Sequence, residues 1–194
     1  MFEGFPRNDA MTSSRIVLAI KDLSGENKDD CLDFIMNLVY FDNSPIGFFG
    51  GPVVGGVCGV GIVLKLSSHH FFRAQLATGV GSNIKVELLS LWGLLSFAKR
   101  CHIVDLMVAG DSKVVLDWFD GKSHLNALIL RPWKMKIMAL KQHFSWLKCL
   151  HVHRQYNSLE DSLSKLAQEL QHGWLQFKEI FKDTLVNNGQ FYIF

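Results

Sequence analysis

Apolar stretches alternate with polar turns along most of the chain, and their periods predict a series of strands and helices. Short continuous or alternating apolar runs predict strands at 35–41, 60–66, 71–78, 103–108 and 147–152. Apolar residues at helical spacing predict helices at 87–100, 112–119, 132–144 and 161–181. The chain therefore opens with strands and continues with strands and helices in alternation.

This order predicts one α/β domain. Three consecutive strands followed by βα units indicate a mixed five-stranded sheet flanked by helices. We expect a poorly ordered N-terminal tail at 1–34, the domain at 35–172, and a C-terminal helix extension and tail at 173–194. Residues just past adjacent strand ends converge at one rim of such a sheet, so functional side chains are expected there.

The stretch 46–64 carries no charge and is nominally long enough to span a bilayer. Seven of its residues are glycine, and Pro52 interrupts it. Glycine at this density favours turns and close backbone approach over a helix. We expect a glycine-rich turn leading into a buried strand, and no membrane partner.

Charge and cysteine content narrow the possibilities further. The formal net charge of +2 is too small to indicate a nucleic-acid partner by itself. The four cysteines are scattered without a Cys-x-x-Cys pair, which excludes a zinc ribbon or knuckle. We expect reduced thiols, an intracellular address in the nucleus or cytoplasm, and a monomer.

Four carboxylates stand at junctions between apolar stretches and polar turns or at helix starts: Asp42, Glu87, Asp111 and Asp161. A lone aspartate in such a place is usually a helix cap, but four in order suggest convergence. Converging carboxylates form an oxygen cage that suits Mg²⁺ or Mn²⁺ rather than zinc. The pattern indicates phosphodiester chemistry.

The segments around these acids resemble the motifs of ribonuclease H type 1 domains. Phe41-Asp42-Asn43-Ser44 with the glycine-rich 47–52 is similar to the family's opening, and Ser82-Asn83-x-x-x-Glu87 to its helix start. The segments 110–118 and 151–161 are similar to its third and fourth motifs. The resemblance covers about residues 36–172 and is closest to ribonuclease-H-like domains of plant genomes and plant retroelements.

The resemblance implies a metal-dependent endoribonuclease that hydrolyses the RNA strand of RNA–DNA hybrids, leaving a 5′-phosphate and a 3′-hydroxyl. Asp42, Glu87, Asp111 and Asp161 would bind two Mg²⁺ ions, with Mn²⁺ as a substitute. Without cations, crowded carboxylates repel one another and at least one should hold a proton.

The same resemblance implies which side chains meet the substrate. Asn83 would read the minor groove, where RNA 2′-hydroxyls are accessible. Asn43, Arg154 and Asn157 would lie close by, with Arg154 offering a two-pronged contact to phosphate. His151 occupies the loop where family members carry a proton-shuttling histidine, and His153 is the alternative candidate for that role.

Three departures from the family pattern are expected on the substrate side. Phe48-Phe49 replaces Asn-Pro in the glycine-rich turn, Ile84 replaces a second asparagine, and Glu160 replaces a small residue. They favour an alternative, a catalytically weakened or inactive retroelement-derived module that binds nucleic acid or a protein. A 3′–5′ exonuclease of related fold is the third hypothesis.

Overall fold

Eight strands form one mixed sheet in the part of the chain that the structure describes, residues 45–153, 158–167 and 169–194 of a computed structural model. The strands are β1 (Ile46–Gly50), β2 (Val53–Val54), β3 (Val57–Lys65), β4 (His70–Val80), β5 (Asp105–Gly110), β6 (Trp146–His151), β7 (Trp174–Phe181) and β8 (Thr184–Tyr192). The helices are α3 (Asn83–Arg100), α4 (Lys113–Phe119), the 3₁₀ turn η2 (Leu128–Leu130), α5 (Arg131–Lys141) and α6 (Ser158–Ala167).

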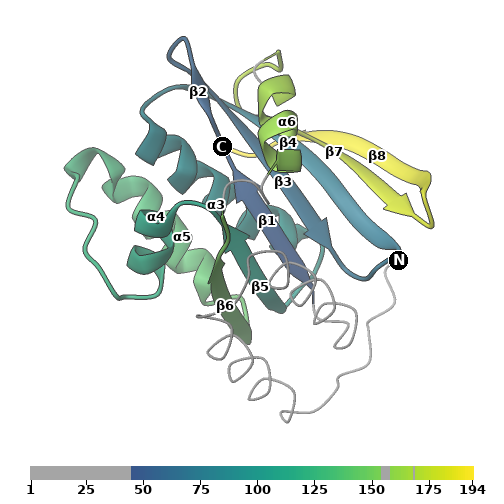
Figure 1. Cartoon of the computed structure of the whole chain (residues 1–194), viewed down its shortest axis with the longest axis horizontal. Coiled ribbons are helices and arrows are strands. Elements are labelled where there is room, and N and C mark those ends of the chain that lie inside the picture. Colours follow the sequence, from purple (N-terminus) through teal and green to yellow (C-terminus); the bar gives the residue numbers. More distant parts are fainter. Residues whose placement is uncertain (1–44, 154–157, 168) are drawn as a thin grey trace. The chain divides into compact units, whose positions relative to one another are not determined.

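The strand order is β6-β5-β1-β3-β4-β7-β8, with β2 pairing on β3 (Figure 1). The pairs β1–β5 and β5–β6 are parallel. The pairs β1–β3, β3–β4, β4–β7 and β7–β8 are antiparallel. The expected mixed sheet with flanking helices is therefore confirmed, and it is extended at one edge by two strands.

The short strand β1 lies at the centre of this sheet, between β5 and β3. All five of its residues are buried, which suits a strand covered on both faces. A Cβ at position 47 would overlap Leu94 of α3, so glycine is needed for the helix to approach the strand this closely. The structure thus has a buried strand at 46–50, where the sequence had led us to expect the start of a glycine-rich turn.

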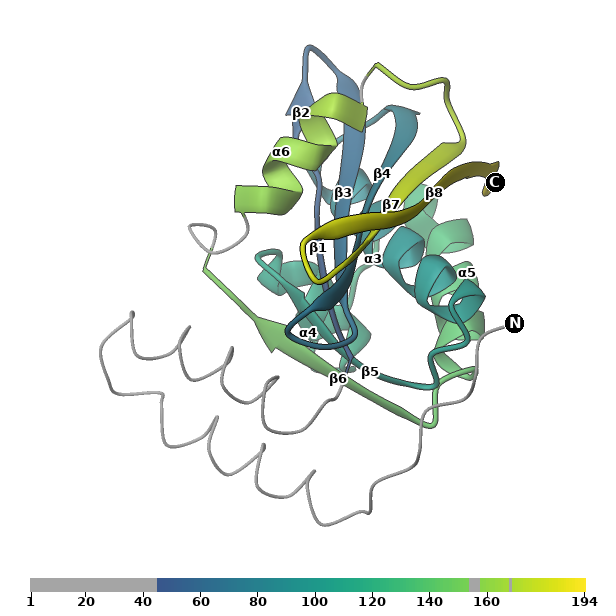
Figure 2. The same ribbon diagram turned by 90° about the vertical axis from the view of Figure 1, so that its right-hand side faces the viewer.

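Helices cover the two faces of the sheet (Figure 2). On one face, α3 packs against β1 and β3 and contacts α5. Its apolar side is almost wholly buried and contributes Leu88, Leu91 and Leu95 to the core. On the other face, α6 packs mainly against β3.

Two sequence predictions concern the ends of the fold. The expected strand at 35–41 lies outside the described residues. The expected helix at 161–181 is wrong in its second half, because α6 ends at Ala167 and residues 174–181 form β7. Gly173, with φ +84°, separates the two elements in a conformation that L side chains rarely adopt.

The β7–β8 hairpin is part of the domain rather than a tail. Leu175 is fully buried, and Phe177 packs against the core. The buried Glu179 carboxylate accepts hydrogen bonds from Asn187 at 3.2 Å and contacts His70 Nε2 at 2.7 Å. Gln75, Gln176 and Gln190 form an amide ladder across β4, β7 and β8. A helical period also fits Trp174 and Leu175, which is why the pattern misled us.

A core substitution in β7 tests whether the hairpin belongs to the fold. We expect Leu175→Ala to lower the free energy of unfolding by about 2–5 kcal/mol, because it removes a fully buried side chain and leaves a cavity. The matched control is Val186→Ala in β8, whose side chain is 53% exposed. It should change stability by less than about 0.5 kcal/mol. Urea unfolding measures both, and equal effects would show that the hairpin is not packed as described.

A second test concerns the close contact between β1 and β5. A Cβ at Gly110 would lie 2.5 Å from Phe49 Cζ, so Gly110→Ala should cost about 1–3 kcal/mol through overpacking. Phe49→Leu removes the ring and should make the added methyl group less costly. Stability of the double variant is compared with the sum of the single variants. Strict additivity would mean that the ring is not the cause.

Candidate functional site

The carboxyl ends of four strands define one rim of the sheet. The strands β1, β5 and β6 are mutually parallel, and β4 runs in the same direction because it is antiparallel to β3. Consequently Gly50, Val80, Gly110 and His151 end their strands at this rim. Of the residues that the sequence singled out, Asp111 directly follows β5, His151 ends β6, and Asn83 begins α3 three residues after the end of β4.

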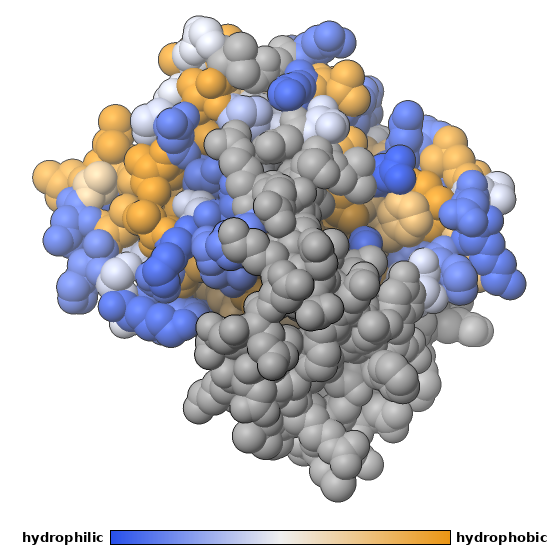
Figure 3. Space-filling view, viewed as in Figure 1, coloured by the Kyte–Doolittle hydropathy of each residue, from blue (hydrophilic) through white to orange (hydrophobic). Residues whose placement is uncertain are grey.

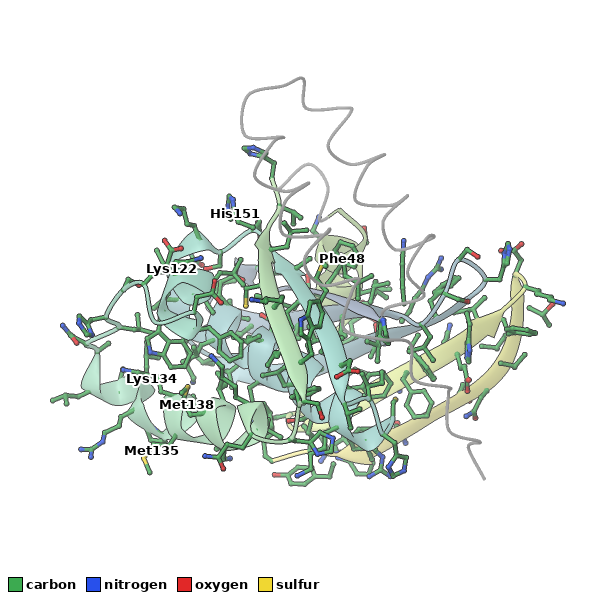
Figure 4. The ribbon with its side chains drawn as sticks, turned by 90° about the horizontal axis from the view of Figure 1, so that it is seen from below. Phe48, Lys122, Lys134, Met135, Met138 and His151 are labelled. Atoms are coloured by element: carbon green, nitrogen blue, oxygen red, sulfur yellow. The ribbon has the colours of Figure 1, made fainter. Side chains whose placement is uncertain are left out.

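Asp111 comes directly after β5 and is half-buried. The ring of His151 lies beside it, with Nε2 3.2 Å from the Asp111 carbonyl oxygen. The Val152 amide donates to the Gly110 carbonyl at 3.0 Å, which fixes the end of β6 against β5. Figure 4 shows His151 at this end of β6. The structure therefore brings two predicted site residues together.

Glu87 and Asn83 reach the rim from α3. The helix begins at Asn83, and Ser82 caps it by accepting from the Lys85 amide at 3.4 Å. Glu87 thus lies in the second turn, not at the helix start as we expected. A Cβ at Gly51 would lie 2.6 Å from Val86 Cγ2, so this turn packs on the end of β1. Asn83 is exposed and Glu87 half-buried.

The two histidines are both at the surface. His151 and His153 are exposed, with ring centroids 6.0 Å apart, while Val152 between them is buried. Both side chains lie on the same face, because residues two apart on an extended chain point to the same side. Of the two histidines, His151 contacts the Asp111 carbonyl oxygen, which also accepts a hydrogen bond from the Lys113 amide at 3.1 Å.

Several predicted site residues fall outside what the structure describes. Asp42, Asn43, Arg154 and Asn157 lie outside the described residues. Asp161 and Glu160 belong to the backbone of α6, but their side chains are not described. Of the four carboxylates expected to bind metal, the structure therefore positions the side chains of Glu87 and Asp111.

The departures from the family pattern do not all face the substrate side. Phe48 and Phe49 belong to β1 and are 5% and 0% exposed, so they are core residues rather than part of a turn. Ile84 is half-buried and packs against the core. Phe48 and Phe49 are therefore buried residues of a strand and not part of the substrate-facing turn that we had expected.

The number of carboxylate ligands at the rim determines whether divalent cations can bind there. The register pairs Phe49 with Gly110, and the next residue along each chain is Gly50 in β1 and Asp111 after β5. Gly50 also lies opposite Gly61 of β3. In the described part of the chain, no group of three or more His, Cys, Asp or Glu side chains is arranged to hold a metal. These donors do not fit two divalent cations, which need several carboxylate ligands.

A groove of about 450 Å³ between α4 and α5 was missed by sequence reasoning. Its apolar lining comes from Trp118, Phe119, Met135 and Met138, and Figure 4 shows Lys134, Met135 and Met138 along α5. Exposed apolar side chains also gather on the side where η2 and α5 lie (Figure 3). The signal lay in the apolar residues at spacing three within α5.

The α5 lysines are not a simple solvated helix face. Lys134 donates to the Leu125 carbonyl and lies 5.6 Å from the Trp118 ring centroid. Lys141 donates to the Phe119 carbonyl at 2.9 Å and lies 4.4 Å from that ring. Lys136 lies 4.5 Å from the Trp133 ring. Each ammonium thus binds an aromatic face and stabilises the packing of α5.

Two partly buried cysteines, Cys101 and Cys149, have raised pKa values. Burial, together with the nearby Glu179 carboxylate, raises the pKa of Cys101 to about 12. Burial also raises the pKa of Cys149, with Asp120 adding to the effect. Both groups remain neutral thiols and are not nucleophiles. Among the described helices, none is long and apolar enough to cross a membrane.

Comparisons with known proteins agree with this geometry. Residues 56–167, more than half of the chain, match the family model described as reverse transcriptase-like. Ribonuclease H1 from Halobacterium salinarum is 25% identical, with a TM-score of 0.58 over 63% of this chain and 96% of its own. No curated protein sequence matches.

Two further solved structures share the fold at lower identity. The N-terminal ribonuclease H domain of Mycobacterium tuberculosis Rv2228c is 23% identical, with a TM-score of 0.58 over 64% of this chain and 98% of its own. LC11 ribonuclease H1 in complex with an RNA/DNA hybrid is 20% identical, with a TM-score of 0.58 over 64% and 96%. The chain thus belongs to the reverse transcriptase-like family and has the ribonuclease H fold.

Proposed function

We propose that this chain is a ribonuclease-H-type domain that binds RNA–DNA hybrids at the rim. The observation that carries the proposal is the convergence of Asn83, Glu87, Asp111 and His151 at the carboxyl ends of the central strands. The related fold of LC11 ribonuclease H1 holding a hybrid supports the same substrate class. We also propose a monomer acting inside the cell, in the nucleus or cytoplasm.

Recognition rests on polar groups that face solvent at this rim. Asn83 is exposed at the first turn of α3, where its amide can donate to and accept from a 2′-hydroxyl. His151 and His153 add two exposed rings next to Asp111. Asn43, Arg154 and Asn157 complete the proposed substrate contacts, with Arg154 directed at phosphate.

Hydrolysis of the RNA strand with two Mg²⁺ ions, or Mn²⁺, is the reaction that the four acids suggest. It requires Asp42 and Asp161 to join Glu87 and Asp111. A second function, hybrid binding without cutting, is favoured by one observation, the glycine next to Asp111 on the central strand. Hybrid binding is common to both functions, and it is the function that the geometry supports best.

Substitution of Asn83 tests the binding proposal. We expect Asn83→Ala to weaken hybrid binding about fivefold, since a hydrogen bond of this kind contributes about 1 kcal/mol. Fluorescence anisotropy with a labelled hybrid in EDTA measures binding without cleavage. Duplex DNA, which lacks 2′-hydroxyls, should bind the wild type and the variant equally.

The matched control is Asn188→Ala, an exposed asparagine in β8 at the far edge of the sheet. It should leave hybrid affinity unchanged. If the wild type binds hybrid no better than duplex DNA, or if both alanine variants weaken binding alike, the rim is not the hybrid site.

A further inference from the structure

We infer that a metal centre at the rim lacks one carboxylate ligand because position 50, beside Asp111, is a glycine. The single substitution Gly50→Asp should therefore create a metal-binding site. The inference deepens the proposed function, because it determines whether the hybrid-binding rim also cuts. It also predicts that the wild-type chain binds hybrid without metal-dependent cleavage.

The register fixes Gly50 as the neighbour of Asp111. Cα partners run from Ile46↔Met107 to Phe49↔Gly110 along the parallel pair β1–β5. One step further along both chains brings Gly50 beside Asp111. Adjacent strands lie about 4.8 Å apart, so side chains at these two positions can share one cation. At Gly50 there is no side chain to do so.

The two positions also share a face of the sheet. Gly47 faces α3, since a Cβ there would overlap Leu94. A Cβ at Gly110 would touch the Phe49 ring, so Phe49 and Gly110 point to one side. Successive residues alternate between faces, which directs Gly50 and Asp111 to the opposite side, where α6 packs. Asp161 belongs to this helix.

Asp42 precedes β1 in the chain, whereas Gly50 is the last residue of that strand. The chain enters β1 through Pro45, whose carbonyl accepts from the Met107 amide at 3.0 Å. Pro45 is therefore at the amino end of the strand, five residues or about 17 Å from Gly50. Asp42 precedes Pro45 by three residues, which extend at most about 11 Å. The sequence motif led us to Asp42 because an apolar run precedes it, as one precedes Gly50.

An aspartate at position 50 should behave differently with and without cations. Next to Asp111, its negative charge is unfavourable in metal-free buffer and should lower stability. A bound Mn²⁺ ion neutralises the repulsion and stabilises the fold by mass action. Gly50→Asn is the matched control, because it has the same shape without the charge.

The experiment measures thermal unfolding of the full chain with EDTA and with millimolar MnCl₂. We expect Mn²⁺ to raise the Tm of Gly50→Asp by about 5 °C or more, and to leave wild type and Gly50→Asn unchanged. A labelled hybrid incubated with Mn²⁺ gives the second readout. In Gly50→Asp, water should add to phosphorus as the bond to the 3′ oxygen breaks, giving a 5′-phosphate, a 3′-hydroxyl and a released proton.

The wild-type chain tests the inference even if the Gly50→Asp variant does not fold. The wild-type chain by itself should show neither a Mn²⁺ shift nor metal-dependent cleavage of the hybrid. Metal-dependent cleavage by the wild type that is lost in Asp42→Asn would overturn the inference. A folded Gly50→Asp variant that binds hybrid but gains neither a Mn²⁺ shift nor cleavage would overturn it too.

The Mn²⁺ measurement tests the inference, and the hybrid-binding measurement tests the proposed function independently. The Mn²⁺ shift is measured without nucleic acid, so it stands or falls regardless of whether the rim binds hybrid. Loss of hybrid binding in the wild type would sink the proposed function alone. Absence of the Mn²⁺ shift in folded Gly50→Asp would sink the inference alone.

Discussion

The central strand β1 sets the geometry of everything at the rim. It is five residues long, and it is held by a parallel ladder to β5 and an antiparallel ladder to β3. Glycines at 47 and 110 allow α3 and the Phe49 ring to pack directly on the backbone. A slip of one residue in this strand would turn every side chain to the other face and change which residue lies beside Asp111.

The same strand pairing determines which residues lie together at the rim. Parallel strands bring Asp111 and His151 to one edge, and α3 adds Asn83 and Glu87 because it starts where β4 ends. The neighbouring strand contributes a glycine at the closest position. Polar side chains are thus gathered at a rim where position 50 of β1 is a glycine.

Away from the rim, a C-terminal hairpin enlarges the sheet, and contacts between lysines and aromatic rings stabilise the packing of α5. The β7–β8 hairpin lengthens the sheet beyond β4 and buries Leu175 against the core. Lysines of α5 bind aromatic faces and backbone carbonyls, so their charge is used locally instead of forming a broad basic surface. A modest net charge is consistent with this use.

The sequence by itself determined the α/β class, most helices and strands between 60 and 152, and the family. Hydrophobic periods and motif order are local, so they can be detected without knowing what packs where. Tertiary structure alone decided that 46–50 is the central strand and that 174–192 is a hairpin. Both segments are apolar in patterns that fit more than one element, and only pairing with distant strands selects between them. The identity of the residue beside Asp111 depends on that pairing, which no local pattern can specify.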